Sequence, residues 1–176
     1  MKYIVVALIL AGASSTIAST QSPYMREELN EIKSLSPGEI NGLLQGSGMG
    51  LAKTAELNQY PGPRHVLDLA EQLHLSDLQI AKTNHVFEEM RENAVVLGKQ
   101  LVDYERKLET LFSSGRISAS KLDSLLLKIG KTKARLRGTH LHAHLEMKKI
   151  LSPHQIVVYD NLRGYSNGTG KHKHTH

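Results

Sequence analysis

The chain has 176 residues, of which 40% are hydrophobic and only 5% aromatic, and it contains no Trp and no Cys. Its core must therefore be built from aliphatic side chains, which favours packed helices over a sheet sandwich. The absence of Cys excludes a disulfide framework and a thiolate metal site. The net charge of +5 is uneven: residues 65–112 hold nine acids and five bases, and residues 113–176 hold three acids and twelve bases. With few aromatic side chains for base stacking, this asymmetry indicates pairing between the acidic and basic halves or anionic partners outside the cytoplasm, and no nucleic acid.

The N-terminus has the pattern of a secretory signal peptide. Lys2 precedes an apolar run from Tyr3 to Ala13, and small residues lead to Ala18. The run has about half of the ~20 residues that a membrane-spanning helix needs, which argues against an anchor. We expect cleavage near Ala18 and a mature protein that does not span a membrane.

Three stretches have the pattern of a capped helix start. In LSDLQI at 75–80, the Ser hydroxyl can accept a hydrogen bond from the backbone N–H three residues on, and the Gln can accept one from the Ser N–H. LSPHQI at 151–156 repeats this capping box, and LSPGEI at 35–40 has Glu in place of Gln. A weaker copy at 117–122 keeps the Ser but has Lys121 in place of the Gln or Glu. The structural motif residues are Leu75, Ser76, Gln79, Leu151, Ser152 and Gln155.

These starts divide the chain into short and long helices. An N-terminal arm (19–64) should hold short helices at 36–44 and 51–57, separated by a Gly-rich loop at 45–50. That loop follows no strand and lacks a Gly-Lys-Ser/Thr sequence, so we interpret it as a connection and not as a phosphate cradle. Another short helix should begin at His65, and the last helix should run from 152 to about 163.

Two long helices are predicted between the motifs. From Ile80, steps of alternately three and four residues land on nine apolar or aromatic positions in ten, which predicts one helix over 76–112, roughly 55 Å long. A second stripe predicts a helix over 119–150, and the short turn around Gly115 makes the pair antiparallel. The fold class is therefore all-α: an elongated antiparallel helical hairpin (65–165) with short flanking helices. Gly98 and Gly130 fall at one level, where we expect the hairpin to bend or its helices to approach closely; the alternative is that both glycines lie on the surface.

The two L-S-x-x-Q motifs bracketing a long hairpin after a signal peptide resemble the Spy/CpxP family of periplasmic proteins. The family's commoner motif is L-T-x-x-Q, from which this chain departs by having Ser in place of Thr. The family includes ATP-independent chaperones, envelope-stress adaptors and metal sensors. The Gly-rich segment 46–53 and the Pro-Gly-Pro at 61–63 are similar to a branch linked to heavy-metal resistance. The resemblance implies a periplasmic location, a role in stress response and a curved antiparallel dimer. Independently, a lone hairpin cannot bury both sides of its apolar stripe, so a homodimer is also expected from the stripe.

A band of cations on the second long helix is the candidate surface for binding clients. Its members are Lys128, Lys131 and Arg135 on one side of the apolar stripe, and Lys133 and Arg137 on the other. Together with nearby Leu side chains, they could hold acidic, amphipathic segments of unfolded or envelope proteins weakly enough for release without ATP. The alternative is that the cations pair with Asp103, Glu105 and Glu109 of the facing helix or are simply solvated.

Histidines near the end of the same helix are the candidate metal ligands. His140 and His144 are one turn apart with Met147 beside them, and imidazole with thioether suits Zn, Ni, Co or Cu. The alternative is three surface histidines, counting His142, on a polar face. The tail 166–176 has no apolar residue and should be disordered. Three tail histidines could bind metal weakly: His172, His174 and His176.

No nucleophile or carboxylate pair accompanies these histidines, so we expect no enzyme and no required cofactor. The leading hypothesis is a periplasmic ATP-independent chaperone-like binding protein of the Spy/CpxP type. Its rival is a heavy-metal sensor or metal-binding resistance protein. A third hypothesis, an adaptor on a membrane sensor kinase, comes from the length of the arm.

Overall fold

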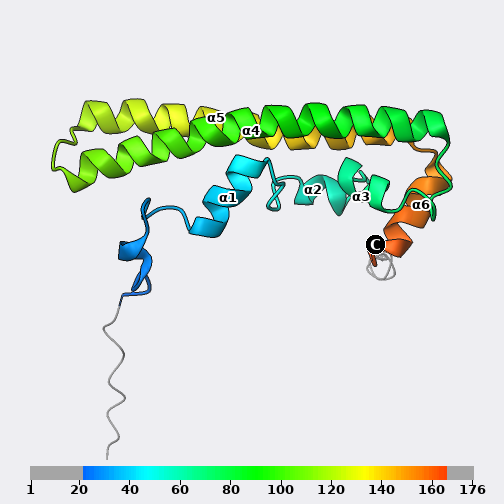
Figure 1. Cartoon of the computed structure of the whole chain (residues 1–176), viewed down its shortest axis with the longest axis horizontal. Helices are drawn as coiled ribbons and strands as arrows, with labels where there is room; N and C mark the ends of the chain where they lie inside the picture. The colour runs from blue at the N-terminus through cyan, green and yellow to red at the C-terminus, as the bar shows by residue number, and fades with distance from the viewer. Residues whose placement is uncertain (1–21, 166–176) are drawn as a thin grey trace, which may run out of the picture.

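A computed structural model describes residues 22–165, and these are helical with no strand. Two long antiparallel helices, α4 (Asp77–Ser113) and α5 (Ala119–Ile150), form the predicted hairpin, and the arm runs along one side of it (Figure 1). This confirms the all-α class and the elongated hairpin with short flanking helices. The shorter elements are the 3₁₀ helix η1 (Glu27–Leu29) and the helices α1 (Pro37–Gln45), α2 (Lys53–Glu56), α3 (Pro63–Asp68) and α6 (Pro153–Leu162).

The predicted capping boxes are confirmed at α1, α4 and α6. Ser36, Ser76 and Ser152 each accept a hydrogen bond from the backbone N–H three residues on, and each Ser N–H donates to the Glu or Gln side chain there. At the start of α5, the Ser118 hydroxyl caps the Lys121 N–H without a returning bond, because a lysine side chain has no acceptor. The serines therefore fix where each of these helices begins.

The arm closes the hydrophobic core of the hairpin. Ile32, Leu35 and Leu43 of the arm are buried in one cluster with α4 and α5 residues such as Leu101 and Leu136. The apolar stripe that seemed to require a second copy is thus covered here by the chain's own arm. A dimer stays a prediction, but this stretch of the stripe no longer argues for it.

The close approach at Gly98 joins α4 to α1, not to α5. A methyl group at Gly98 would collide with the Leu43 carbonyl, whose carbon lies 2.7 Å from the methyl position, whereas one at Gly130 would have no neighbour within 4 Å. The predicted contact between the two long helices at these glycines is therefore wrong. Gly46, at φ 71, ends α1 where a methyl would lie 2.9 Å from the Arg91 carbonyl oxygen of α4. Two glycines thus let α1 lie directly on the backbone of α4.

A second cluster packs the open end of the hairpin. It contains Val66 of α3, Met147 near the end of α5, and Ile156 and Tyr159 of α6. Helix α6 folds back beneath this end, beside α3 (Figure 1). No helix among residues 22–165 is both long and apolar enough to cross a membrane. The predicted signal peptide and tail lie outside the described residues.

Candidate functional site

The basic band lies on the exposed surface of α5, and its two sides have different surroundings. Lys133 pairs with Glu105 of α4 at 3.0 Å. No other member of the band forms an ion pair with residues 22–165: these are Lys128, Lys131, Arg135 and Arg137. The alternative of pairing across the hairpin therefore holds for Lys133 alone.

Two of the three acids expected to neutralise the band have other ion-pair partners. Glu109 pairs with Lys33 of the arm at 2.7 Å, and Asp103 pairs with Arg106 on its own helix at 3.2 Å. Glu105 also accepts a hydrogen bond from the Ser34 hydroxyl at 3.1 Å. The docked arm thus takes up carboxylates that could have met α5, which leaves the band exposed as positive charge.

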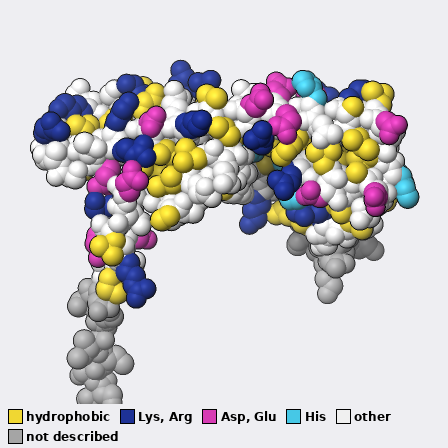
Figure 2. All heavy atoms as spheres, in the orientation of Figure 1, with side chains coloured by type: hydrophobic (Ala, Val, Ile, Leu, Met, Phe, Trp, Pro, Cys, Tyr) yellow, Lys and Arg dark blue, Asp and Glu magenta, His cyan; other side chains and the backbone are white. Residues whose placement is uncertain are grey.

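Apolar surface lies beside the exposed cations. Leu126 and Leu127 are 49% and 76% exposed. Gly130 and Gly138 follow on α5 with nothing packed above them. Figure 2 shows Lys and Arg side chains over the tip end of the hairpin, with apolar patches between them. The exposed face of α5 thus combines cations that are unpaired within residues 22–165 with exposed Leu side chains.

The histidines of α5 are placed differently from either expectation. His140 and His144 are only 3% and 7% exposed, so a polar-face location is wrong for these two, while His142 is exposed. Met147 is fully buried in the cluster of α3 and α6. Within residues 22–165, no three His, Asp or Glu side chains are grouped to hold a metal ion. The tail histidines His172, His174 and His176 lie outside the described residues.

The two buried histidines line a cavity of about 660 Å³ beneath the Gly-rich loop. His144 Nδ1 lies 2.7 Å from the Tyr60 carbonyl oxygen, which can only accept, so this nitrogen carries the hydrogen. A neutral His144 therefore keeps a free lone pair on Nε2. The Nε2 atom of His140 is buried with no hydrogen-bond partner, and burial lowers the pKa of this imidazole, with a smaller contribution from His144.

A partly buried carboxylate that the sequence did not single out joins the arm to the hairpin and to α6. Glu56 of α2 accepts hydrogen bonds from the Tyr159 hydroxyl at 2.6 Å and the Tyr165 hydroxyl at 3.1 Å. Its carboxylate also lies 3.7 Å from His144 and 3.4 Å from the Arg163 guanidinium. Burial, with the hydrogen bond to Glu56, raises the pKa of Tyr159 well above its usual range. No sequence motif marks this network, because its members come from separate short elements.

The two motif glutamines meet in space, which the sequence reading also missed. The amide nitrogen of Gln79 donates to Gln155 Oε1 at 2.9 Å, and that of Gln155 donates to Gln79 Oε1 at 3.1 Å. The same nitrogens reach the backbone carbonyls of Ile150 and Leu73 at 2.9 and 3.1 Å. Each glutamine thus closes its own capping box and ties the starts of α4 and α6 together. The available signal was that these two boxes have Gln, whereas the unpaired box at α1 has Glu39.

The described fold and surface define an all-helical protein whose arm is packed on a long helical hairpin. Comparison with protein-family models, curated proteins and solved structures gave no match for this chain.

Proposed function

We propose that the chain is a periplasmic, ATP-independent binding protein of the Spy/CpxP type, which holds unfolded or envelope proteins on the exposed face of α5. The observation that carries the proposal is the row of Lys128, Lys131 and Arg135. These cations have no carboxylate partner among residues 22–165 and lie beside exposed leucines. Exposed ion pairs contribute at most about 1 kcal/mol each, so a client would be held weakly and released without an energy source.

The arm does not favour the adaptor hypothesis. Its apolar residues Ile32, Leu35 and Leu43 are buried on the hairpin, so they are not available to a membrane kinase in this conformation. The exposed face of α5 is accessible to a binding partner without any rearrangement of the fold. Client binding therefore needs fewer changes to the fold than recruitment through the arm.

Neutralising the row should reduce client protection severalfold. The variant Lys128→Gln/Lys131→Gln/Arg135→Gln removes the attraction for acidic client segments and leaves the buried stripe intact. Aggregation of an acidic, chemically unfolded client would be followed by light scattering with the mature protein present. A matched control, Lys82→Gln/Lys99→Gln/Lys149→Gln, makes the same charge change at exposed positions elsewhere. Equal protection by both variants, or no protection by the wild type, would contradict the proposal.

Metal binding is the second candidate function. It is supported by two imidazoles that line one cavity: His144, whose Nδ1 is bonded to the Tyr60 carbonyl, and His140, whose Nε2 has no hydrogen-bond partner among residues 22–165. A chain lacking residues 171–176 would be titrated with Zn, Ni, Co and Cu salts by calorimetry. If the cavity binds metal, stoichiometric heat should disappear in His144→Ala and persist in His154→Ala, which changes an exposed histidine of α6. Identical titrations of both variants would rule out this site, whatever the result with clients.

A further inference from the structure

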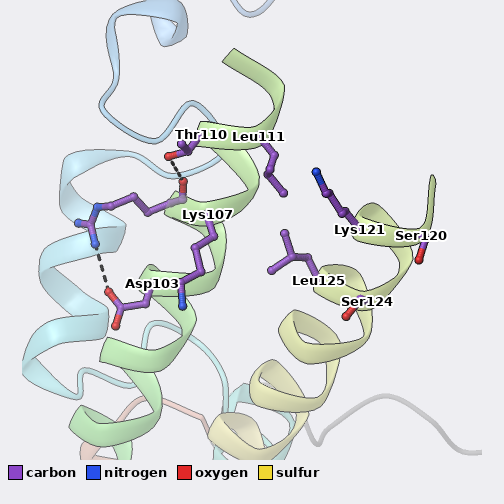
Figure 3. A pocket seen from close by; sticks show the side chains of 9 residues that line it. Asp103, Lys107, Thr110, Leu111, Ser120, Lys121, Ser124 and Leu125 are labelled. Atoms are coloured by element: carbon purple, nitrogen blue, oxygen red, sulfur yellow. Dashed lines mark hydrogen bonds and ion pairs between the residues drawn. The ribbon is translucent and has the colours of Figure 1, made fainter. Parts of the chain in front are cut away.

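The tip of the hairpin carries a groove that the fold and the basic band do not use. It has a volume of about 910 Å³ and lies between the ends of α4 and α5. Lys107, Thr110 and Leu111 line it from α4, and Lys121, Ser124 and Leu125 line it from α5. Figure 3 shows Leu111, Lys121 and Leu125 projecting into the space between the two helices. The groove thus has an apolar floor and a rim of cations and hydroxyl groups.

The rim of the groove carries uncompensated positive charge. Its one acid, Asp103, is paired with Arg106, and Arg106 also pairs with Glu31 of the arm at 2.9 Å. Lys121 donates to the Arg116 backbone carbonyl at 2.9 Å, so its charge meets no carboxylate. Lys107 forms no ion pair with residues 22–165 and lies 5.7 Å from the centre of the Tyr104 ring. An occupant with negative charge is therefore the electrostatic complement.

Another face of the same helix end shows how a short segment packs beside such a surface. There Glu105 and Glu109 border a groove that shares no α4 residue with the basic one. The chain's own arm borders this groove: Lys33 and Ser34 line it, Lys33 pairs with Glu109 at 2.7 Å, and the flanking Ile32 and Leu35 are buried in the core. A short segment that combines apolar side chains with a charge opposite to that of the rim is thus the kind of occupant that this hairpin holds.

The groove also continues into the basic band. Lys121, Lys128 and Arg135 follow at intervals of seven residues, so they lie on one face of α5 over about 21 Å. No Asp or Glu occurs in α5 between Asp123 and Glu146. A segment anchored in the groove could therefore extend along α5 without meeting negative charge from that helix.

We propose that this basic tip groove docks an acidic peptide segment of a client or partner protein, with an apolar side chain seated between Leu111 and Leu125 and carboxylates facing Lys107 and Lys121. This inference rests on the proposed function and adds the anchoring site and the chemistry of the bound segment. Because the groove is open and its cations are exposed, binding should weaken as the ionic strength rises.

The probe is a fluorescein-labelled synthetic peptide of alternating Leu and Asp pairs, with two comparison peptides in which Lys replaces Asp or Ser replaces Leu. Fluorescence anisotropy should show binding of the Leu/Asp peptide alone. The charge reversal Lys107→Glu/Lys121→Glu should weaken it about tenfold or more, and Lys82→Glu/Lys99→Glu should leave it nearly unchanged. Since Lys121 also holds the turn, Ser124→Trp provides a second variant that fills the groove and keeps its charges.

The position of the bound peptide can be measured by site-specific crosslinking, because the chain has no native cysteine that would compete for the label. A photoreactive group attached to Ser124→Cys should crosslink the Leu/Asp peptide, and the same group on Asn93→Cys, exposed on α4, should not. Three results would each contradict docking in the groove: equal affinity for all three peptides, unchanged affinity in both groove variants, or equal crosslinking at the two positions. The aggregation assay with the band variant separately decides the proposed function. If the groove proposal fails, the peptide will not bind the groove although the protein still protects clients. If the proposed function fails, clients will not be protected although the peptide still binds.

Discussion

Gly98→Ala should destabilise the protein by about 1–3 kcal/mol, although alanine is the better helix former. The added methyl group would collide with the Leu43 carbonyl, so α1 must shift away from α4. The shift would also loosen the packing of Leu43 in the shared core. Urea unfolding followed by circular dichroism measures the change in free energy, and hydrogen exchange should show faster exchange of the α1 amides.

Gly130→Ala is the matched control, because it makes the same change inside a long helix where the methyl meets nothing within 4 Å. This variant should be stabilised by up to about 1 kcal/mol through helix propensity. The opposite signs of the two effects are the diagnostic result. If Gly98→Ala were stabilised as much as Gly130→Ala, α1 would not pack on α4 as described.

Gln79→Glu should cost about 1–3 kcal/mol, even though it preserves the capping box. A carboxylate can still accept the Ser76 N–H, but it cannot donate to the Ile150 carbonyl or to Gln155. Two acceptors would then face a negative charge at a partly buried position. Urea unfolding again measures the loss, which should shrink as the pH falls toward about 4 and protonation restores a donor.

The reverse exchange, Glu39→Gln, tests whether the position or the residue type matters. Glu39 accepts from the Ser36 N–H at 2.8 Å in the box of α1, which has no second box beside it. An amide oxygen can accept this bond equally, so the change should stay within about 0.5 kcal/mol. A similar loss at both positions would mean that Gln79 acts only as a cap.

Much of the fold could be predicted because its signals are local. Periodic apolar residues and Ser caps placed both long helices within a residue or so of their observed ends, and the start of α5 at Ala119 was matched. The position of the basic band on one face of α5 could also be predicted, because helical spacing alone decides which residues share a face. Its pairing could not, because that depended on where the arm carries Lys33 and Ser34.

The histidines illustrate the limit for the candidate site. Helical spacing correctly placed His140 and His144 on one face of α5. Whether that face is exposed to solvent depends on which other segments pack on it. The Gly-rich loop and the residues around Tyr60 cover this face, and the sequence of α5 does not indicate that they pack there. Met147, assigned with them from helical spacing, instead packs in the cluster with α3 and α6.

Local sequence signals predicted the all-helical class, the two long helices, the Ser-capped short helices and the capping role of the L-S-x-x-Q motifs, whereas α2 and α3 differ from their expected bounds of 51–57 and a start at His65. These features depend on hydrogen bonds and periodicities within a few residues. Three contacts became visible only in the folded structure: α1 packs against Gly98, Gln79 and Gln155 form hydrogen bonds with each other, and Glu56 accepts hydrogen bonds from two tyrosines. The physical reason is that each of these contacts joins groups far apart in the chain, so its energy exists only after the arm and α6 have packed on the hairpin.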